Sequence, residues 1–264
     1  IHLVGNTVVD AAQQAIERIE ARQSRPAALN DETDPMRAHA LATDSVIRTR
    51  AAARLMIVTA HRRENWGGPI QGIFRAVAME LAAHDELSVV WTLHANPALA
   101  ASVRALHAGL PQELGRRLHL AEPLGYMEMI SLMRRAWLVL TDSGGLQEEA
   151  CSLGVPVLVL RDHTERPELI EAGAGRLIGT QPLTVAAEIE RLWREPGLHQ
   201  AMQAVRNPFG DGHAAVRIAQ VMSVWYNGDR EPRGASARVA TGLTGAARAL
   251  RQRAGERPKP QGPA

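Results

Sequence analysis

Two short polar segments of this sequence combine residue types that bind phosphate groups. The first, Asp142 to Gly145 (DSGG), follows the apolar run Trp137–Thr141 and precedes a segment with helical spacing. Paired glycines let the backbone approach an anion closely, and a helix start offers unpaired N–H groups at the positive end of its dipole. Ser143 adds a hydroxyl donor. A phosphate or diphosphate would fit this pattern, although glycine turns are common and the turn alone favours an ordinary tight connection.

A carboxylate lies one helical turn beyond these glycines. Glu149 follows Gly145 by four residues, so both fall on one face of the expected helix. Acidic side chains near phosphate-binding turns accept hydrogen bonds from ribose hydroxyls. A carboxylate at Glu149 could therefore accept hydrogen bonds from two ribose hydroxyls. The alternative is that Glu148 and Glu149 form a solvated pair.

The second polar segment is His61-Arg62-Arg63-Glu64-Asn65, which follows the apolar run Leu55–Ala60. Two guanidinium groups and an imidazole form a cationic edge suited to phosphates. The structural alternative is a solvated loop with internal Arg–Glu pairing.

Three further loops follow apolar runs of the same kind. His94 comes after Ser88–Leu93 and is open to a functional or a structural role, whereas Asn96 is predicted to cap a helix. The loop 121–126 contains Pro and Gly, and its unpaired backbone groups could read a flat base edge, although a plain turn is favoured. Residues 161–168 are highly charged and either line a cleft or pair with one another.

All these segments belong to an alternation of apolar runs and amphipathic stretches. The apolar runs are 55–60, 88–93, 117–120, 137–141, 156–160 and 176–179, and helical spacing covers about 70–83, 97–108, 126–135, 145–153, 165–172 and 182–194. This alternation predicts an α/β fold with a parallel sheet and helices on both faces. Ligands of such sheets bind beyond the carboxyl ends of the strands, where the candidate residues fall.

The two ends of the sequence differ from this alternation. A helix is expected after Asn6-Thr7, a loop over 24–36 and a last helix over 211–226, and the Gly-, Pro- and Arg-rich residues 229–264 predict disorder. The segment 229–264 carries a charge of +5, so with a total of +2 the remaining residues sum to −3. A slightly acidic body argues against binding of nucleic acid.

Composition and missing motifs exclude several classes of protein. The sequence is 45% hydrophobic and 22% charged, which is typical of a soluble globular protein, and it lacks an apolar run of the roughly 18 residues that a membrane helix needs. Its one cysteine, Cys151, suits a reducing cytoplasm. HxxxH, HExxH, GxxxxGK[ST] and GxSxG patterns are absent, so we expect no metal and no cofactor.

Taken together, the motifs resemble the non-hydrolysing UDP-N-acetylglucosamine 2-epimerases. The matching segments are GNTVVDA at 5–11, TAHRREN at 59–65, HANP at 94–97, LTDSGGLQEEACSLGVPVLVLRDHTERPE at 140–168 and NPFGDGHA at 207–214. The resemblance implies a Rossmann-like domain over 1–228, with an inter-domain connection region at 1–50. It would be the C-terminal half of a two-domain GT-B-like fold of the UDP-glycosyltransferase/glycogen phosphorylase type. The family's N-terminal half, which carries the acidic residues assigned to proton transfer at C2, is absent from these residues.

The resemblance also implies roles for individual residues. His61 would stabilise departing UDP, and Arg62 and His94 would contact an activating second molecule of UDP-GlcNAc. The implied substrate-binding residues are Leu124, whose backbone would meet the uracil, Ser143, Gly144 and Gly145, which would hold the diphosphate, and Glu149, which would bind the ribose.

The implied reaction is reversible epimerisation at C2 between UDP-GlcNAc and UDP-ManNAc, by elimination and re-addition of UDP, for bacterial surface polysaccharide synthesis. We expect a cytoplasmic isomerase that is a homodimer at full length, and an isolated chain that is inactive. Two alternatives stay open: a UDP-sugar glycosyltransferase of GT-B fold, and a non-catalytic UDP-binding remnant.

Overall fold

The computed structural model describes residues 1–23 and 54–228, so the predicted loop at 24–36 and the predicted disorder at 229–264 lie outside the described residues. The chain forms two compact units, Ile1–Ala215 and Val216–Ala264. Within the described residues, none of the helices combines the length and the apolar character needed to cross a bilayer.

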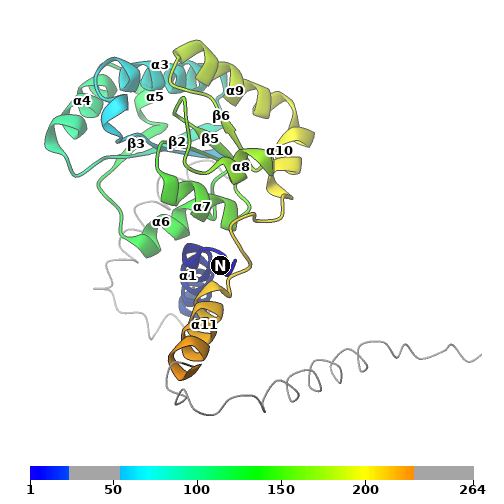
Figure 1. Ribbon diagram of the computed structural model, residues 1–264. Coiled ribbons are helices and arrows are strands. Elements are labelled where there is room, and N and C mark those ends of the chain that lie inside the picture. Colours follow the sequence, from blue (N-terminus) through cyan, green and yellow to red (C-terminus); the bar gives the residue numbers. More distant parts are fainter. Residues whose placement is uncertain (24–53, 229–264) are drawn as a thin grey trace, which may run out of the picture. The chain divides into compact units, whose positions relative to one another are not determined.

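A parallel sheet of six strands forms the centre of the first unit, in the order β3-β2-β1-β4-β5-β6 (Figure 1). The strands are β1 (Arg54–Thr59), β2 (Leu87–Thr92), β3 (Leu118–Ala121), β4 (Leu138–Thr141), β5 (Val157–Val159) and β6 (Gly175–Leu177). The order reverses between the adjacent strands β1 and β4, which places a topological switch point in the middle of the sheet.

Helices cover both faces of this sheet (Figure 1). The helical elements are α1 (Thr7–Gln23), the 3₁₀ turn η2 (Arg63–Asn65), α3 (Gly68–Ala83), α4 (Pro97–Ala108), α5 (Gln112–Gly115), α6 (Tyr126–Met133), α7 (Gly144–Ser152), α8 (Pro167–Glu171), α9 (Pro182–Arg194), α10 (Pro196–Gln203) and α11 (Ala214–Gly228).

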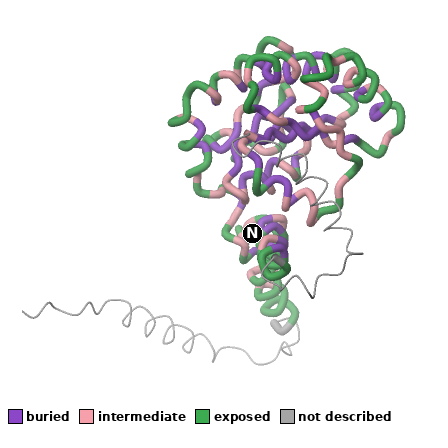
Figure 2. The backbone as a smooth tube through the Cα atoms, turned by 180° about the vertical axis from the view of Figure 1, so that it is seen from behind, coloured by how far each residue is buried: buried purple, intermediate pink, exposed green. Residues whose placement is uncertain are grey.

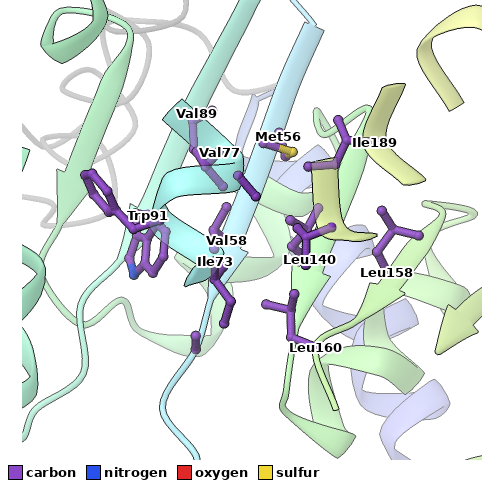
Figure 3. Packing of buried hydrophobic residues seen from close by; sticks show 14 of the residues in the cluster. Met56, Val58, Ile73, Val77, Val89, Trp91, Leu140, Leu158, Leu160 and Ile189 are labelled. Carbon is purple, nitrogen blue, oxygen red and sulfur yellow. The ribbon is translucent and has the colours of Figure 1, made fainter. Parts of the chain in front are cut away.

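Alternate strand residues feed two separate cores. Met56 and Val58 of β1 pack with α3, α4 and α9, and Figure 3 shows them with Ile73 of α3 and Ile189 of α9. Leu55 and Ile57 point to the opposite face, where α6 and α7 cover the sheet and α1 packs against both helices. A strand that is apolar on both faces has to be central and covered on both sides, and Figure 2 shows the sheet as buried backbone between helices whose outer sides are exposed.

The expected strands and most expected helices are present, and the differences have local causes. The helix expected at 165–172 begins only at Pro167, because Arg166 has φ −124° and ψ 60°. The last helix begins at Ala214 rather than 211, because Gly210 and Gly212 have φ of 140° and 82°. η2, α5 and α10 were not predicted.

Two of the sequence motifs are structural partners. In the first unit, Asn6 donates its backbone N–H to the carbonyl of Phe209 at 2.8 Å, and the buried Asp10 accepts hydrogen bonds from the N–H groups of Ala214 (3.1 Å) and Ala215 (2.9 Å). A Cβ at Gly212 would overlap the Gln13 side chain. The GNTVVDA and NPFGDGHA segments therefore fix the start of the first helix against the end of the first unit.

Candidate functional site

The candidate site lies beyond the carboxyl ends of β1 and β4, which are hydrogen-bonded neighbours at the switch point. The HRREN segment follows β1 and the DSGG segment follows β4. The structure thus brings together the two segments that the sequence singles out, from positions far apart in the chain.

Asp142 joins these two segments. Its side chain is fully buried, at 0% exposure, and its Oδ2 accepts hydrogen bonds from the backbone N–H groups of His61 (2.8 Å) and Arg62 (2.8 Å) and from the amide of Asn65 (2.9 Å). Its Oδ1 makes no hydrogen bond and lies 3.3 Å from Nδ1 of His61. Because Nδ1 faces Asp142, the other ring nitrogen of His61, Nε2, is left for a ligand.

His94 lies beside His61. The two imidazole rings stack with their centroids 5.3 Å apart and their planes 7° apart. Nδ1 of His94 accepts a hydrogen bond from the backbone N–H of Asn96 at 3.0 Å. The side chain of Asn96 in turn accepts from Ala98 and Leu99, which confirms its predicted role as the cap of α4.

The glycine turn opens helix α7. Ser143 is its N-cap residue and makes no side-chain capping bond, so its hydroxyl is not used by the helix. The first N–H groups of α7 have no partner within the helix, as at any helix start. A Cβ built on Gly145 would meet nothing within 4 Å. The turn is therefore open to an anion on the Gly145 side.

The charged loop after β5 reaches the same edge. Arg161 binds Glu64 at 2.7 Å and Glu165 at 2.8 Å, and Arg62 lies 3.4 Å from Glu165. The bond from Arg161 lowers the pKa of Glu165. The Arg161–Glu165 pair confirms pairing within 161–168. Glu64 and Arg62, however, pair with that loop and not with each other, so the contacts join the two charged segments and hold Arg62 at the site edge.

The adjacent carboxylates of α7 have different surroundings. Glu148 is buried and is bound by the side chains of Asn6 (2.8 Å) and Arg166. Glu149 is half-buried and makes no ion pair with any described residue. Burial, followed by repulsion from Glu148, raises the pKa of Glu149. Glu149 is therefore the member of the pair left for a ligand.

The loop that carries Leu124 approaches α7. Leu124 is half-buried against the core on that face of the sheet. Glu149 contributes to the raised pKa of Tyr126, although burial of Tyr126 contributes more. The loop is ordered by Glu128, whose carboxylate accepts the backbone N–H of Gly125 at 2.7 Å. The structure thus places the loop of Leu124 near the proposed ribose residue.

Asp142, Asn65 and Arg166 lie in segments that the sequence singles out, but sequence reasoning gave none of them a role of its own. Arg166 binds Glu148, and its guanidinium would lie 3.5 Å from a Cβ on Gly144, so it adds a cation beside the glycine turn. The position of Asp142, between a buried strand and two glycines, could have marked it as important. Its hydrogen-bond partners, however, follow β1 and could not be read from its own neighbours in the sequence.

Comparisons with known proteins support one family. Residues 1–223 match the family model described as UDP-N-acetylglucosamine 2-epimerase. The chain is 38% identical over 225 residues to a probable UDP-N-acetylglucosamine 2-epimerase of Ralstonia nicotianae, covering 85% of this chain and 55% of the relative. It is 37% identical over 222 residues to the UDP-N-acetylglucosamine 2-epimerase of Salmonella typhimurium, covering 84% and 54%.

A solved structure agrees with these relatives. The structure of UDP-GlcNAc 2-epimerase from Neisseria meningitidis bound to UDP-GlcNAc superposes with a TM-score of 0.71 at 32% identity, covering 84% of this chain and 54% of that one. The first unit is thus an α/β domain of the kind that forms one half of a GT-B-like fold, as predicted. The chain belongs to the UDP-N-acetylglucosamine 2-epimerase family, and it spans about half the length of the curated relatives it matches.

Proposed function

We propose that this chain is the nucleotide-binding half of a UDP-N-acetylglucosamine 2-epimerase, an isomerase that interconverts UDP-GlcNAc and UDP-ManNAc. One observation carries the proposal: Asp142 holds the backbone of His61 and Arg62 against the glycine turn at the start of α7. An imidazole, a guanidinium and open helix N–H groups then converge where a diphosphate fits. The binding domain covers residues 1–228, with 1–50 as the inter-domain connection region.

The diphosphate is assigned to Ser143, Gly144 and Gly145. The Ser143 hydroxyl is not used for capping, and Gly145 leaves open space for an approaching phosphate. Arg62 and Arg166 add positive charge at the edge, each already paired with a glutamate. Paired cations of this kind keep their donors oriented toward an incoming anion.

The nucleoside is assigned to Glu149 and Leu124. Glu149, on the second turn of α7, accepts hydrogen bonds from the ribose hydroxyls. The backbone of Leu124 meets the uracil, since its loop approaches Glu149 through Tyr126. Ribose hydroxyls would replace the water that Glu149 loses through its partial burial.

His61 is the group assigned to chemistry. Elimination breaks the bond between C1 of the sugar and the β-phosphate oxygen, so negative charge develops on that phosphate. The helix N–H groups and Nε2 of His61 stabilise this charge as UDP leaves. The same contacts hold UDP when it is re-added to C1 to give the C2 epimer. Asp142 acts as a positioning residue, because it contacts His61 and not the substrate.

Proton transfer at C2 is assigned to residues outside this chain. The carboxylates near the described site already have roles or partners. Glu149 is assigned to the ribose, Asp142 accepts from the HRREN segment, Glu148 is bound by Arg166, and Glu64 and Glu165 are paired with Arg161. A base at C2 would come from the other half of the enzyme, and the isolated chain would not epimerise UDP-GlcNAc.

We further propose that the full-length protein is a cytoplasmic homodimer whose product feeds surface polysaccharide synthesis, and that Arg62 and His94 contact a second UDP-GlcNAc. His94 is exposed and stacks on His61, so a ligand at His94 would touch the catalytic imidazole. This contact would couple the second nucleotide sugar to the reaction.

The ribose assignment is tested by calorimetric titration of UDP and of pyrophosphate. Glu149→Ala should weaken UDP binding about tenfold, the loss expected for hydrogen bonds to a charged group, and should leave pyrophosphate binding unchanged. Glu171→Ala, at an exposed position of α8, is the matched control. Equal weakening of UDP and pyrophosphate binding would refute the ribose assignment. If the unsubstituted protein bound neither ligand, nucleotide binding itself would be refuted.

A further inference from the structure

A second cluster of titratable side chains lies on the other edge of the sheet. Glu80 and His84 come from the end of α3, one helical turn apart, and Glu190 comes from α9. His84 precedes β2 and accepts the backbone N–H of Leu87, the first residue of that strand, so the cluster sits at the amino ends of the strands. The candidate nucleotide site lies at the carboxyl ends, and the two sites share no residue.

The spacing of the cluster fits a metal ion. Nε2 of His84 lies 2.5 Å from Oε2 of Glu190 and 3.6 Å from Oε2 of Glu80, and the three ligand atoms all fall within 4.8 Å of one another. Tetrahedral zinc with bonds of about 2.0 Å separates its ligand atoms by about 3.3 Å. The two observed separations lie on either side of that value. At 2.5 Å, His84 and Glu190 share a hydrogen bond, so zinc would replace that bond and move the two atoms apart by about 0.8 Å.

Glu80 supplies an independent indication of a ligand. Its side chain is buried, at 6% exposure, and its Oε2, which faces His84, has no hydrogen-bond partner. A buried carboxylate oxygen without a donor destabilises the fold unless a cation or a proton neutralises it. Burial, followed by the charge of Glu190, raises the pKa of Glu80 to about 7, and Arg194 opposes that rise.

Surrounding contacts hold the three ligands in place. The ring of His84 stacks on Trp193 with centroids 4.0 Å apart, and Trp193 also carries the guanidinium of Arg54 at 4.1 Å. The carbonyl of His84 accepts a hydrogen bond from Arg117 at 2.7 Å, and Oε1 of Glu190 is bound by Arg194. Supporting contacts of this kind orient metal ligands and limit the cost of assembling the site.

We propose that Glu80, His84 and Glu190 bind one zinc ion, with water in the fourth position. One imidazole nitrogen and two carboxylate oxygens are a donor set that zinc accepts, whereas Mg²⁺ and Ca²⁺ favour oxygen ligands alone. The ion links α3 to α9, which cover the same face of the sheet, and so stabilises that layer. The charged groups facing Glu80 are His84 on its own helix and Glu190 and Arg194 on α9.

Titration of the protein with ZnCl₂ in a calorimeter tests this site, using a chain without a histidine tag. The unsubstituted protein and Glu188→Gln should bind one equivalent. Glu188 lies on the same helix as Glu190 but pairs with Arg176. His84→Gln and Glu190→Gln should each weaken that binding at least tenfold, and MgCl₂ should produce no saturable heat.

Thermal melting and cobalt absorption keep the proposal falsifiable if one variant is unstable. Zinc should raise the Tm of the unsubstituted protein and of Glu188→Gln, but not of Glu190→Gln, whose changed side chain is partly exposed. Cobalt(II) should give the strong visible absorption of a tetrahedral site with a nitrogen ligand, and His84→Gln should abolish it. Zinc affinity that is equal in all four proteins, or an absence of saturable binding, would overturn the proposal and leave a cluster that shares a proton.

Discussion

Buried carboxylates lie at both edges of the sheet, and their surroundings differ. At the carboxyl edge, Oδ2 of Asp142 accepts three N–H donors from the HRREN segment. At the amino edge, Glu80 faces another carboxylate and a histidine, and one of its oxygens has no donor. Neutral donors stabilise a buried negative charge, whereas a second carboxylate favours protonation or a bound cation. The first arrangement therefore fixes the HRREN backbone beside the start of α7, and the second leaves a buried oxygen that a cation or a proton could neutralise.

Removing the carboxylate of Asp142 should destabilise the protein more than any other substitution at these two clusters. Asp142→Ala leaves two backbone N–H groups and the Asn65 amide without their acceptor, so we expect a loss of about 3 kcal/mol or more in the free energy of unfolding. Asp142→Asn keeps one acceptor oxygen and should lose less. Urea unfolding measures both, and equal small losses would show that Asp142 is not the link between the two segments.

The contribution of Glu80 to the free energy of unfolding should depend on pH. Its folded pKa of about 7 lies above the ordinary value of 4.5, so its stabilising contribution is complete below pH 4.5 and is lost as pH rises to 7. With a chelator present, Glu80→Gln removes this loss. The variant should therefore gain stability relative to the unsubstituted protein as pH rises from 4.5 to 7, by on the order of 2 kcal/mol.

Urea unfolding at a series of pH values measures that difference. Curves that stay parallel for the two proteins would mean that Glu80 ionises as easily in the folded state as in the unfolded state. The contrast with Asp142 would then disappear.

Gly145 should separate binding from stability. A Cβ there meets nothing within 4 Å, so Gly145→Leu should change the free energy of unfolding by less than about 1 kcal/mol. The same side chain would occupy the space assigned to the diphosphate, and UDP affinity should fall at least tenfold. Gly197→Leu, at another open glycine near a helix start, is the control and should leave UDP affinity unchanged. Retained UDP affinity in Gly145→Leu would place the phosphates elsewhere.

Much of the fold could be predicted because its signals are local. Apolar runs with residues for both faces predicted central strands, and Pro97 and Pro182 marked helix starts that the structure confirms. α10 was missed because Pro196 lies two residues after the end of α9. It was interpreted as the end of one helix, and not also as the first residue of the next. The start of α11 was misplaced by the two positive-φ glycines of the NPFGDG segment.

For the candidate site, the sequence could predict only which residues follow the carboxyl ends of strands. His61 and the Ser143–Gly145 turn were expected at one edge because parallel strands end together, and the structure places them on neighbouring strands. The role of Asp142 depends on the order of strands in the sheet, which no local pattern states. The same holds for Glu190, whose partners on α3 are distant in sequence and meet it only through helix packing.

We propose that this chain binds the nucleotide and lacks the C2 base. Proton NMR of the isolated protein with UDP-GlcNAc in D₂O tests both parts in one sample. Saturation should transfer from the protein to the uracil and ribose protons, while the C2 proton of the sugar keeps its full intensity. Absence of saturation transfer would contradict nucleotide binding, and exchange of the C2 proton for deuterium would place the base within these residues.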